Sequence, residues 1–369
     1  KNIGLIAALL YSFSFLQILF DRRYWHLTPG PFLSLLVLYS LYKIKKGSLK
    51  FIYLLTGALI FGWNTDYTNL VLFLFVFLAW IIFKLPIKKK EVLFAVILFS
   101  FSNLPLVVFD LRHDFLNSKA FVSYFSHKSG VKVEESQRHF SDRETLGETA
   151  FEQTYQTALL PLITFSRLFY INSELDISTQ HTYCKDYIFE RNSAQGMILP
   201  LICFLLICLF AYLTYKNRNS KSALSYKLIL AFYLIFQLGV LFYAGIFKGD
   251  VFEHYLATLL PYLFIITAVV LDYFINKKYG KIVYLIIGVF VLINIYQNFR
   301  AYNTFGFLYK IDAAKYVLDN IKGQEYSLDS IGSCFRYDGF YYPFILNNSH
   351  PVKSYQDPNY SWLYDYEVS

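Results

Sequence analysis

Residues 104–120, LPLVVFDLRHDFLNSKA, combine an apolar run with a dense group of ionisable side chains. Asp110, Arg112, His113 and Asp114 fall within five consecutive positions at the end of that run. On a helix that continued through the group, the two aspartates and the histidine would share one face, and the arginine would point away. A cation and a titratable imidazole at the mouth of a cavity suit a charged ligand group. The alternative is a structural ion network that holds the following loop.

Two more groups of candidate residues lie at the ends of apolar runs. Arg22 and Arg23 follow the first run, where they can bind a phosphate through forked hydrogen bonds or act as interfacial anchors. Glu253, His254 and Tyr255 begin a later run. The free backbone donors at a helix N-terminus favour an anion, and His254 would add a further donor. The alternative for this second group is an acidic first turn that only caps the helix.

The composition indicates a membrane protein. Of 369 residues, 56% are hydrophobic and only 16% are charged, which exceeds the apolar content that a water-soluble domain of this length needs. Lys and Arg outnumber Asp and Glu by 34 to 26, but their positions along the chain explain this excess better than a nucleic-acid partner does. The four cysteines show no C-x-x-C spacing and no neighbouring histidine cluster, so no metal site is predicted. Pairing of Cys184 with Cys334 stays open.

Nine apolar stretches are long enough to cross, or nearly cross, the hydrocarbon core of a bilayer as helices. The expected fold class is therefore an all-α polytopic membrane protein with about nine transmembrane helices. The second and third stretches are short, and we expect them to be tilted or partly shielded. The predicted spans are residues 3–20, 31–45, 51–65, 68–84, 91–109, 197–215, 226–247, 252–275 and 280–297.

Basic residues divide the loops between these spans into two sets. The loops YKIKKGSLK, KLPIKKKE, YKNRNSKSALSYK and NKKYGK hold 15 Lys and Arg, whereas the short loops of the other set hold 3. The positive-inside rule places the first set in the cytoplasm. The three groups of candidate residues then face the extracytoplasmic side of the cell membrane.

Two longer segments are expected on the same outer side. Residues 110–196 form an external loop of the transmembrane domain, residues 1–297, and the stretch 155–170 is expected to lie along the membrane interface as a helix. Residues 298–369 form a small extracytoplasmic α/β appendage. A helix in this appendage ends with Gly323 as its cap. Its apolar face comprises Ile311, Ala314, Val317, Leu318 and Ile321.

Three stretches resemble a known enzyme family. They are YSFSFLQILFDRRYWHLTPGPFLSLLVLYSLYKI, LPLVVFDLRHDFLNSKA and FEHYLATLLPYLFIITAVVLDYF, and they are similar to bacterial GT-C glycosyltransferases of the protein-mannosyltransferase and aminoarabinose-transferase type. The resemblance covers most of residues 1–300. It implies a multi-helix membrane enzyme that moves a sugar from a polyprenyl-phosphate carrier to a lipid, glycan or protein acceptor on the outer face. No cofactor is implied, although use of a divalent cation stays open.

The resemblance also implies which residue types carry out each step of the transfer. The departing lipid phosphate gains from cationic donors, and the acceptor hydroxyl needs a carboxylate base. The base of the family lies in an external loop after its first helix, and no such loop precedes residue 110, so the base is expected upstream of Lys1. Asp66 is therefore assigned to a turn that caps the next helix. The candidate cationic donors are Arg22, Arg23, Arg112, His113 and His254.

The main alternative function is a transporter or flippase for a lipid or polar solute. Such proteins often contain inverted repeats and helices broken by polar or glycine residues near the bilayer midplane. The charges of this sequence gather instead at the outer ends of the spans, so glycosyl transfer is preferred. A membrane scaffold and a polymerase or ligase of surface polysaccharide are further alternatives, and the latter would use the same kind of carrier.

Overall fold

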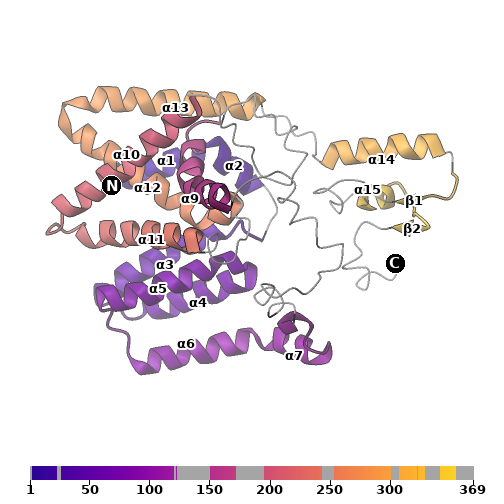
Figure 1. Cartoon of the computed structure of the whole chain (residues 1–369), viewed down its shortest axis with the longest axis horizontal. Coiled ribbons are helices and arrows are strands. Elements are labelled where there is room, and N and C mark those ends of the chain that lie inside the picture. The colour runs from indigo at the N-terminus through magenta and orange to yellow at the C-terminus, as the bar shows by residue number, and fades with distance from the viewer. Residues whose placement is uncertain are drawn as a thin grey trace. The chain divides into compact units, whose positions relative to one another are not determined.

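The computed structural model shows a mostly helical chain (Figure 1). Arg23, Cys184 and Cys334, named above, lie outside the residues that it describes. The chain divides into unit 1, made of Lys1–Ile171 and Glu190–Tyr296, and unit 2, made of Asn172–Phe189 and Gln297–Ser369. The described residues are 2–22, 26–119, 122, 150–171, 195–242, 253–300, 307–321, 323–328 and 341–354.

Unit 1 holds most of the helices, and the described residues of each predicted span lie mainly on one to three successive elements. η1 and η6 are 3-10 helices, and η7 is a π-helix. The elements are α1 (Asn2–Phe13), α2 (Phe15–Arg22), α3 (Gly30–Lys45), α4 (Phe51–Thr65), η1 (Tyr67–Asn69), α5 (Leu70–Phe83), α6 (Lys89–Ser102), α7 (Leu104–Arg112), α9 (Ala150–Arg167), α10 (Gln195–Lys216), α11 (Ala223–Phe242), η6 (Glu253–Leu259), α12 (Leu260–Phe274), η7 (Ile275–Tyr279) and α13 (Gly280–Arg300).

Fewer helices qualify as membrane spans by length and apolar character than the sequence predicts. Within the described residues, three stretches qualify, Ile198–Lys216, Ala223–Phe242 and Glu253–Arg300, and the bent pairs α1–α2 and α6–α7 raise the number to five. The third stretch contains a break at Lys277, whose φ and ψ are −100° and −170°. α4 and the η1–α5 segment are apolar but shorter. A multi-pass membrane protein is therefore supported, whereas about nine spans stays a prediction.

α12 forms the centre of unit 1. Its residues from Leu260 to Val270 are almost all buried, because α1, α3, α10 and α11 pack around it. Tyr262 stacks on Phe232 of α11 with ring centroids 4.0 Å apart, and its hydroxyl donates to the carbonyl oxygen of Ser34 in α3 at 2.8 Å. A helix that is buried on every side carries apolar residues around its whole circumference, and the sequence of α12 has this pattern.

The packing defines two ends of unit 1. Gly30 at the start of α3 lies against Thr258, and four residues later the Ser34 carbonyl meets Tyr262, so α3 and α12 run in the same direction. At the far end of α3, the ammonium of Lys45 donates to the carbonyl oxygen of Phe83, the last residue of α5, at 2.5 Å. We call the end at residues 43–50, 84–90, 216–227 and 277–281 the lysine-rich end, and the end at residues 21–22, 26–30, 62–70 and 253–259 the opposite end.

α9 packs inside unit 1, which corrects the expectation that residues 155–170 lie along the membrane interface. Leu160, Ile163, Phe165 and Leu168 are buried, and α9 contacts α10, α11 and η6. An interfacial helix keeps its polar face in water, but Thr164 is also fully buried here. The apolar residues of this stretch fill the space between helices.

The break between α1 and α2 is supported by side chains from other elements. The two helices meet at an angle of 67°. The Ser14 hydroxyl donates to the Leu168 carbonyl oxygen at 2.8 Å, and the Phe15 amide donates to Asn294 Oδ1 at 2.7 Å. Asn294 Nδ2 in turn donates to the Phe169 carbonyl oxygen at 3.1 Å. Backbone groups freed by a bend must find such partners inside a membrane domain.

Unit 2 contains α14 (Phe307–Ile321), β1 (Ser327–Leu328), α15 (Tyr341–Leu346) and β2 (Lys353–Ser354). β1 and β2 pair in parallel, and α14 packs against α15. The predicted helix is present, Ala314 on its apolar face is buried, and Gly323 has a positive φ of 79°. The two strands have two residues each, so the α/β character of the appendage is not confirmed.

Candidate functional site

A contact between an imidazole and a carboxylate joins two loops at the opposite end of unit 1. His26, which precedes α3, and Asp66, which follows α4, lie with Nε2 and Oδ2 2.8 Å apart. The other carboxylate oxygen accepts a hydrogen bond from the Thr68 amide at 2.7 Å, which caps η1 and confirms the predicted role of Asp66. The side chain of His26 is 53% exposed and that of Asp66 is 14% exposed. The carboxylate therefore orients an imidazole that water and ligands can reach.

The turn that contains Asp66 packs closely on α3 and η6. Asn69 is buried, and its Nδ2 donates to the Gly62 carbonyl oxygen at 3.0 Å. A Cβ atom on Gly30 would lie 3.2 Å from Thr258 Cγ2 and 3.6 Å from Asn69 Oδ1, so a larger residue would have to displace the Thr258 side chain by a few tenths of an ångström. Asn69 Oδ1 and Thr258 Oγ1 are buried without a hydrogen-bond partner in the described part of the chain. The polar character of this end thus extends into the bundle.

A buried ion pair ties α9 to η6. Arg167 Nε lies 2.9 Å from Glu253 Oε1, and the two side chains are 12% and 2% exposed. Removing two such charges from water costs several kcal/mol for each ion, and only their mutual attraction and further hydrogen bonds offset this cost. Sequence reasoning missed Arg167. The signal that could have found it is a single basic residue in the otherwise apolar stretch 155–170.

η6 carries the predicted group of Glu253, His254 and Tyr255. The pairing of Glu253 with Arg167 favours the structural alternative for this carboxylate, which also lies in the first turn of the helix, where a negative charge is stabilising. His254 and Tyr255 are partly exposed, and their rings contact edge to face with centroids 4.4 Å apart. The expected binding role of these two side chains stays a prediction.

The group after α7 is arranged differently from the prediction. α7 ends at Arg112, and Asp114 and Phe115 adopt positive φ angles of 52° and 61°, so the helix does not continue through the group. The expectation that both aspartates and His113 share one helical face is therefore wrong. The cause is Asp110, around whose carboxylate the backbone turns.

Asp110 holds this turn together. Its carboxylate accepts hydrogen bonds from the backbone amides of Asn117 and Ser118 at 2.7 and 3.0 Å, and another from the Ser118 hydroxyl. Asp110 is buried, whereas Arg112 and His113 are exposed. The structural alternative thus accounts for Asp110, and the two cationic candidates remain accessible to a ligand.

His113 is positioned by the end of α7. Its Nδ1 lies 2.8 Å from the Phe109 carbonyl oxygen, which can only accept, so Nδ1 carries the proton. The imidazole also stacks on the Phe109 ring with centroids 4.0 Å apart. This arrangement fixes the tautomer, so that Nε2 of the neutral ring is the acceptor nitrogen.

α6 and α7 lie along the lower edge of unit 1 in Figure 1, beside α4, whereas α9 and α12 lie in its upper half. Trp63 Nε1 of α4 donates to Asn103 Oδ1, at the break between α6 and α7, at 2.8 Å. The described contacts therefore attach α7 to α6 and α4. They do not bring Arg112 and His113 together with His254 and Tyr255 in one cluster.

Arg22 is the last residue of α2 and is exposed. The preceding helical turns contain hydrogen-bonded polar side chains, centred on Gln17, that the sequence analysis did not predict. Gln17 is fully buried, and its Nε2 donates to Tyr11 Oη at 2.8 Å and to Asp21 Oδ1 at 2.9 Å. Its Oε1 is buried without a hydrogen-bond partner among the described residues. The i, i+4 spacing of Gln17 and Asp21 within an apolar stretch is the signal that points to it.

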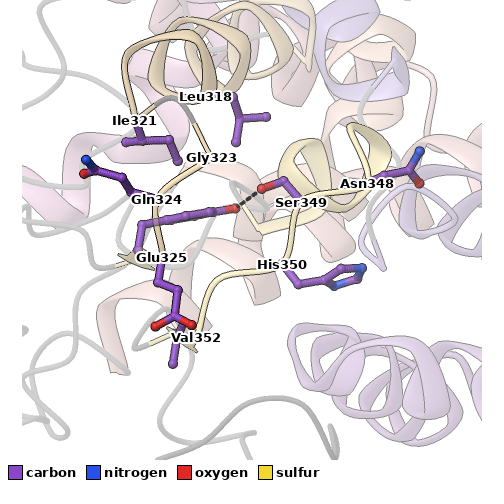
Figure 2. Close-up of a pocket in the computed structure, with 10 residues that line it drawn as sticks. Leu318, Ile321, Gly323, Gln324, Glu325, Asn348, Ser349, His350 and Val352 are labelled. Carbon is purple, nitrogen blue, oxygen red and sulfur yellow. Dashed lines mark hydrogen bonds between the residues drawn. The ribbon is translucent and has the colours of Figure 1, made fainter.

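Unit 2 has a pocket of about 240 Å³ between α14 and the segment that follows α15 (Figure 2). Tyr326 Oη and Ser349 Oγ lie 2.9 Å apart across it. Figure 2 shows the side chains of Glu325 and His350 pointing away from each other, so the charged groups of the pocket do not converge on one point. A ligand site normally needs a few convergent polar groups, and this pocket is the weaker candidate.

The groups available for chemistry at the opposite end of unit 1 are exposed arginine side chains and an imidazole that a carboxylate orients. Within the described residues, no group of three His, Cys, Asp or Glu side chains could hold a metal ion. Orientation of the His26 imidazole by Asp66 and the accessible guanidinium groups of Arg22 and Arg112 suit an anionic substrate. No protein-family model, no curated protein and no solved structure matches this chain.

Proposed function

We propose that the chain belongs to a membrane enzyme that transfers a sugar from a polyprenyl-phosphate carrier to an extracytoplasmic lipid, glycan or protein. The observation that carries the proposal is the charged layer at the opposite end of unit 1, formed by His26 with Asp66 and by Arg167 with Glu253. Ionisable residues in a membrane domain are costly and serve function far more often than stability. The resemblance to GT-C glycosyltransferases supplies the reaction class.

The exposed side chains around the charged layer each have a task in this reaction. The guanidinium groups of Arg22 and Arg112 bind the carrier phosphate and stabilise the charge that it gains as the sugar leaves, and His113 donates to it from Nε2 in its doubly protonated form. His254 and Tyr255, in the first turn of η6, add further hydrogen-bond donors. The His26–Asp66 and Arg167–Glu253 contacts hold the loop before α3 and η6, whereas the Asp110 carboxylate holds the turn that presents Arg112 and His113. The layer faces outward if the lysine-rich end is cytoplasmic.

The test uses the protein expressed from its whole coding sequence in membranes that contain a radiolabelled polyprenyl-phosphate sugar. We expect label to reach a lipid, glycan or protein, and we expect Arg112→Ala and His113→Ala to reduce this transfer at least tenfold, since one donor to a developing anion contributes about 10²–10³ in rate. Lys119→Ala, an exposed cation on the same loop, is the matched control and should keep full activity. Unchanged transfer in both variants would exclude the carrier-binding role.

Transport of a lipid is the second candidate, and the helix breaks favour it. α1 and α2 are bent by 67° and α6 and α7 by 42°, and discontinuous helices line the substrate sites of many transporters. Buried Gln17 lies just beyond the first break. The same labelled membranes separate the two functions. Redistribution of intact labelled lipid between leaflets, with no labelled product, would support transport.

A further inference from the structure

A group of cations gathers at the lysine-rich end of unit 1, away from the candidate site. Lys216 at the end of α10 and Lys277 in η7 both lie over the ring of Tyr273, with Nζ 5.8 and 5.9 Å from its centroid. Arg218 lies over Tyr215 at 4.8 Å. We call Lys216, Arg218, Lys277 and Lys278 the α10–η7 basic cluster. All four side chains are exposed.

The backbone of η7 creates this arrangement. α10 packs on α12, which brings the last turns of the two helices together. At Lys277 the backbone leaves helical geometry, with φ −100° and ψ −170°, and the chain reverses into α13. Lys216 of α10 and Lys277 of η7 therefore lie over the same tyrosine ring although they come from separate elements.

The cluster has no acidic partner in the part of the chain that the structure describes. No carboxylate lies within the 4.0 Å limit of an ion pair there, and the nearest acidic residue in sequence, Asp272, instead accepts a hydrogen bond from Asn276 Nδ2 at 3.1 Å. A cation over an aromatic ring gains little at an exposed site, so the ring contacts compensate the positive charges of the cluster only weakly. A bound anion would compensate them.

The position of the cluster identifies the anion. α10 and the η6–α13 stretch are among the helices long and apolar enough to span a membrane, so the ends of α10 and α12 lie at the level of the lipid head groups. Tyrosine is enriched at this level, and basic pockets between transmembrane helices bind acidic phospholipids. We propose that the α10–η7 basic cluster binds the head group of an anionic phospholipid. This site is independent of the proposed transfer reaction.

The test measures which phospholipids stay bound to the purified protein. The wild type and the double variant Lys216→Gln/Lys277→Gln are reconstituted into nanodiscs of phosphatidylcholine that contain about 30% phosphatidylglycerol. The lipids that each protein retains after mild detergent extraction are then counted by native mass spectrometry. We expect the wild type to retain phosphatidylglycerol over phosphatidylcholine and the double variant to lose about tenfold of this preference.

The control is Lys46→Gln/Lys89→Gln, which removes the same charge from the same end. Lys46 lies over the ring of Tyr42, and within the described residues neither lysine shares a ring with another lysine as Lys216 and Lys277 do. The control should keep the preference of the wild type within about twofold. Equal losses in both double variants would show general attraction to an acidic surface, and no loss would leave the cluster with only a topological role. Either result overturns the proposal.

A second arm distinguishes the lipid from free phosphate. Inorganic phosphate is added at increasing concentration during extraction, with sodium chloride at equal ionic strength as the comparison. We expect both salts to displace phosphatidylglycerol equally. Displacement by phosphate well below the effective chloride concentration would identify a site for the free ion and refute the lipid assignment.

Discussion

Removing the buried carboxylate of Glu253 provides the sharpest check on the structure. Glu253→Gln keeps the shape of the side chain but leaves the guanidinium of Arg167 charged, at 12% exposure and without the carboxylate 2.9 Å away. Breaking a buried pair by removing one partner costs about 3–5 kcal/mol, because the remaining charge stays out of water. We therefore expect a loss of unfolding free energy of about 3 kcal/mol or more.

The assay is reversible unfolding in mixed detergent micelles, followed by tryptophan fluorescence, since Trp63 and Trp80 both lie in unit 1. The double variant Arg167→Met/Glu253→Gln removes both charges and should recover most of the loss, as apolar replacements of buried ion pairs often do. Lys90→Gln is the control. Its ammonium lies 3.9 Å from Glu91 and is 79% exposed, so we expect a change below about 0.5 kcal/mol.

Two results would refute this reasoning. If Glu253→Gln costs less than about 1 kcal/mol, the pair is open to water and the packing of α9 on η6 is not as the structure has it. If the double variant loses as much as its two single changes added together, the side chains do not interact, because coupled residues deviate from additivity by about 0.5–3 kcal/mol. We expect the double variant to lose at least about 2 kcal/mol less unfolding free energy than the two single variants added together.

Two further predictions concern the packing around the site and are checked by the same unfolding assay. Gly30→Ala should destabilise unit 1 by about 1–3 kcal/mol, because the new Cβ meets Thr258 at 3.2 Å, whereas Gly57→Ala, with nothing within 4 Å, should be neutral or stabilising. Asn294→Ala should cost about 1–3 kcal/mol, since it leaves the Phe15 amide without its acceptor at the α1–α2 break. A loss no larger for Gly30→Ala than for Gly57→Ala, or an unchanged Asn294→Ala variant, would contradict these assignments.

The helices were largely predictable because their signal is local. Apolar runs of about the right length located the described helices of unit 1, although α9, whose run was recognised as helical, was placed at the membrane surface. The cap at Asp66 and the positive φ of Gly323 were also predictable, since each depends on a few neighbouring residues. The number of membrane spans was not, because bends at Ser14 and Asn103 decide whether two short helices cross together.

The contacts of the site were not predictable because they join residues distant in sequence. Arg167 and Glu253 carry no pattern that would pair them, and His26 was passed over within a loop of other candidate residues. The failure at residues 110–114 has a different cause. Asp110 competes for the backbone amides that follow α7, and this local hydrogen bonding ends the helix that the spacing argument assumed.

The two ends of unit 1 therefore differ in how their charges are compensated, and the difference is itself testable by salt. At the opposite end, Arg167 and Glu253 neutralise each other in a buried position, where dissolved ions screen weakly. In the α10–η7 basic cluster, exposed Lys216 and Lys277 have no carboxylate partner among the described residues, and a Debye length of about 8 Å at physiological salt allows strong screening. Raising ionic strength should thus weaken lipid retention while it leaves the unfolding free energy lost by Glu253→Gln nearly unchanged.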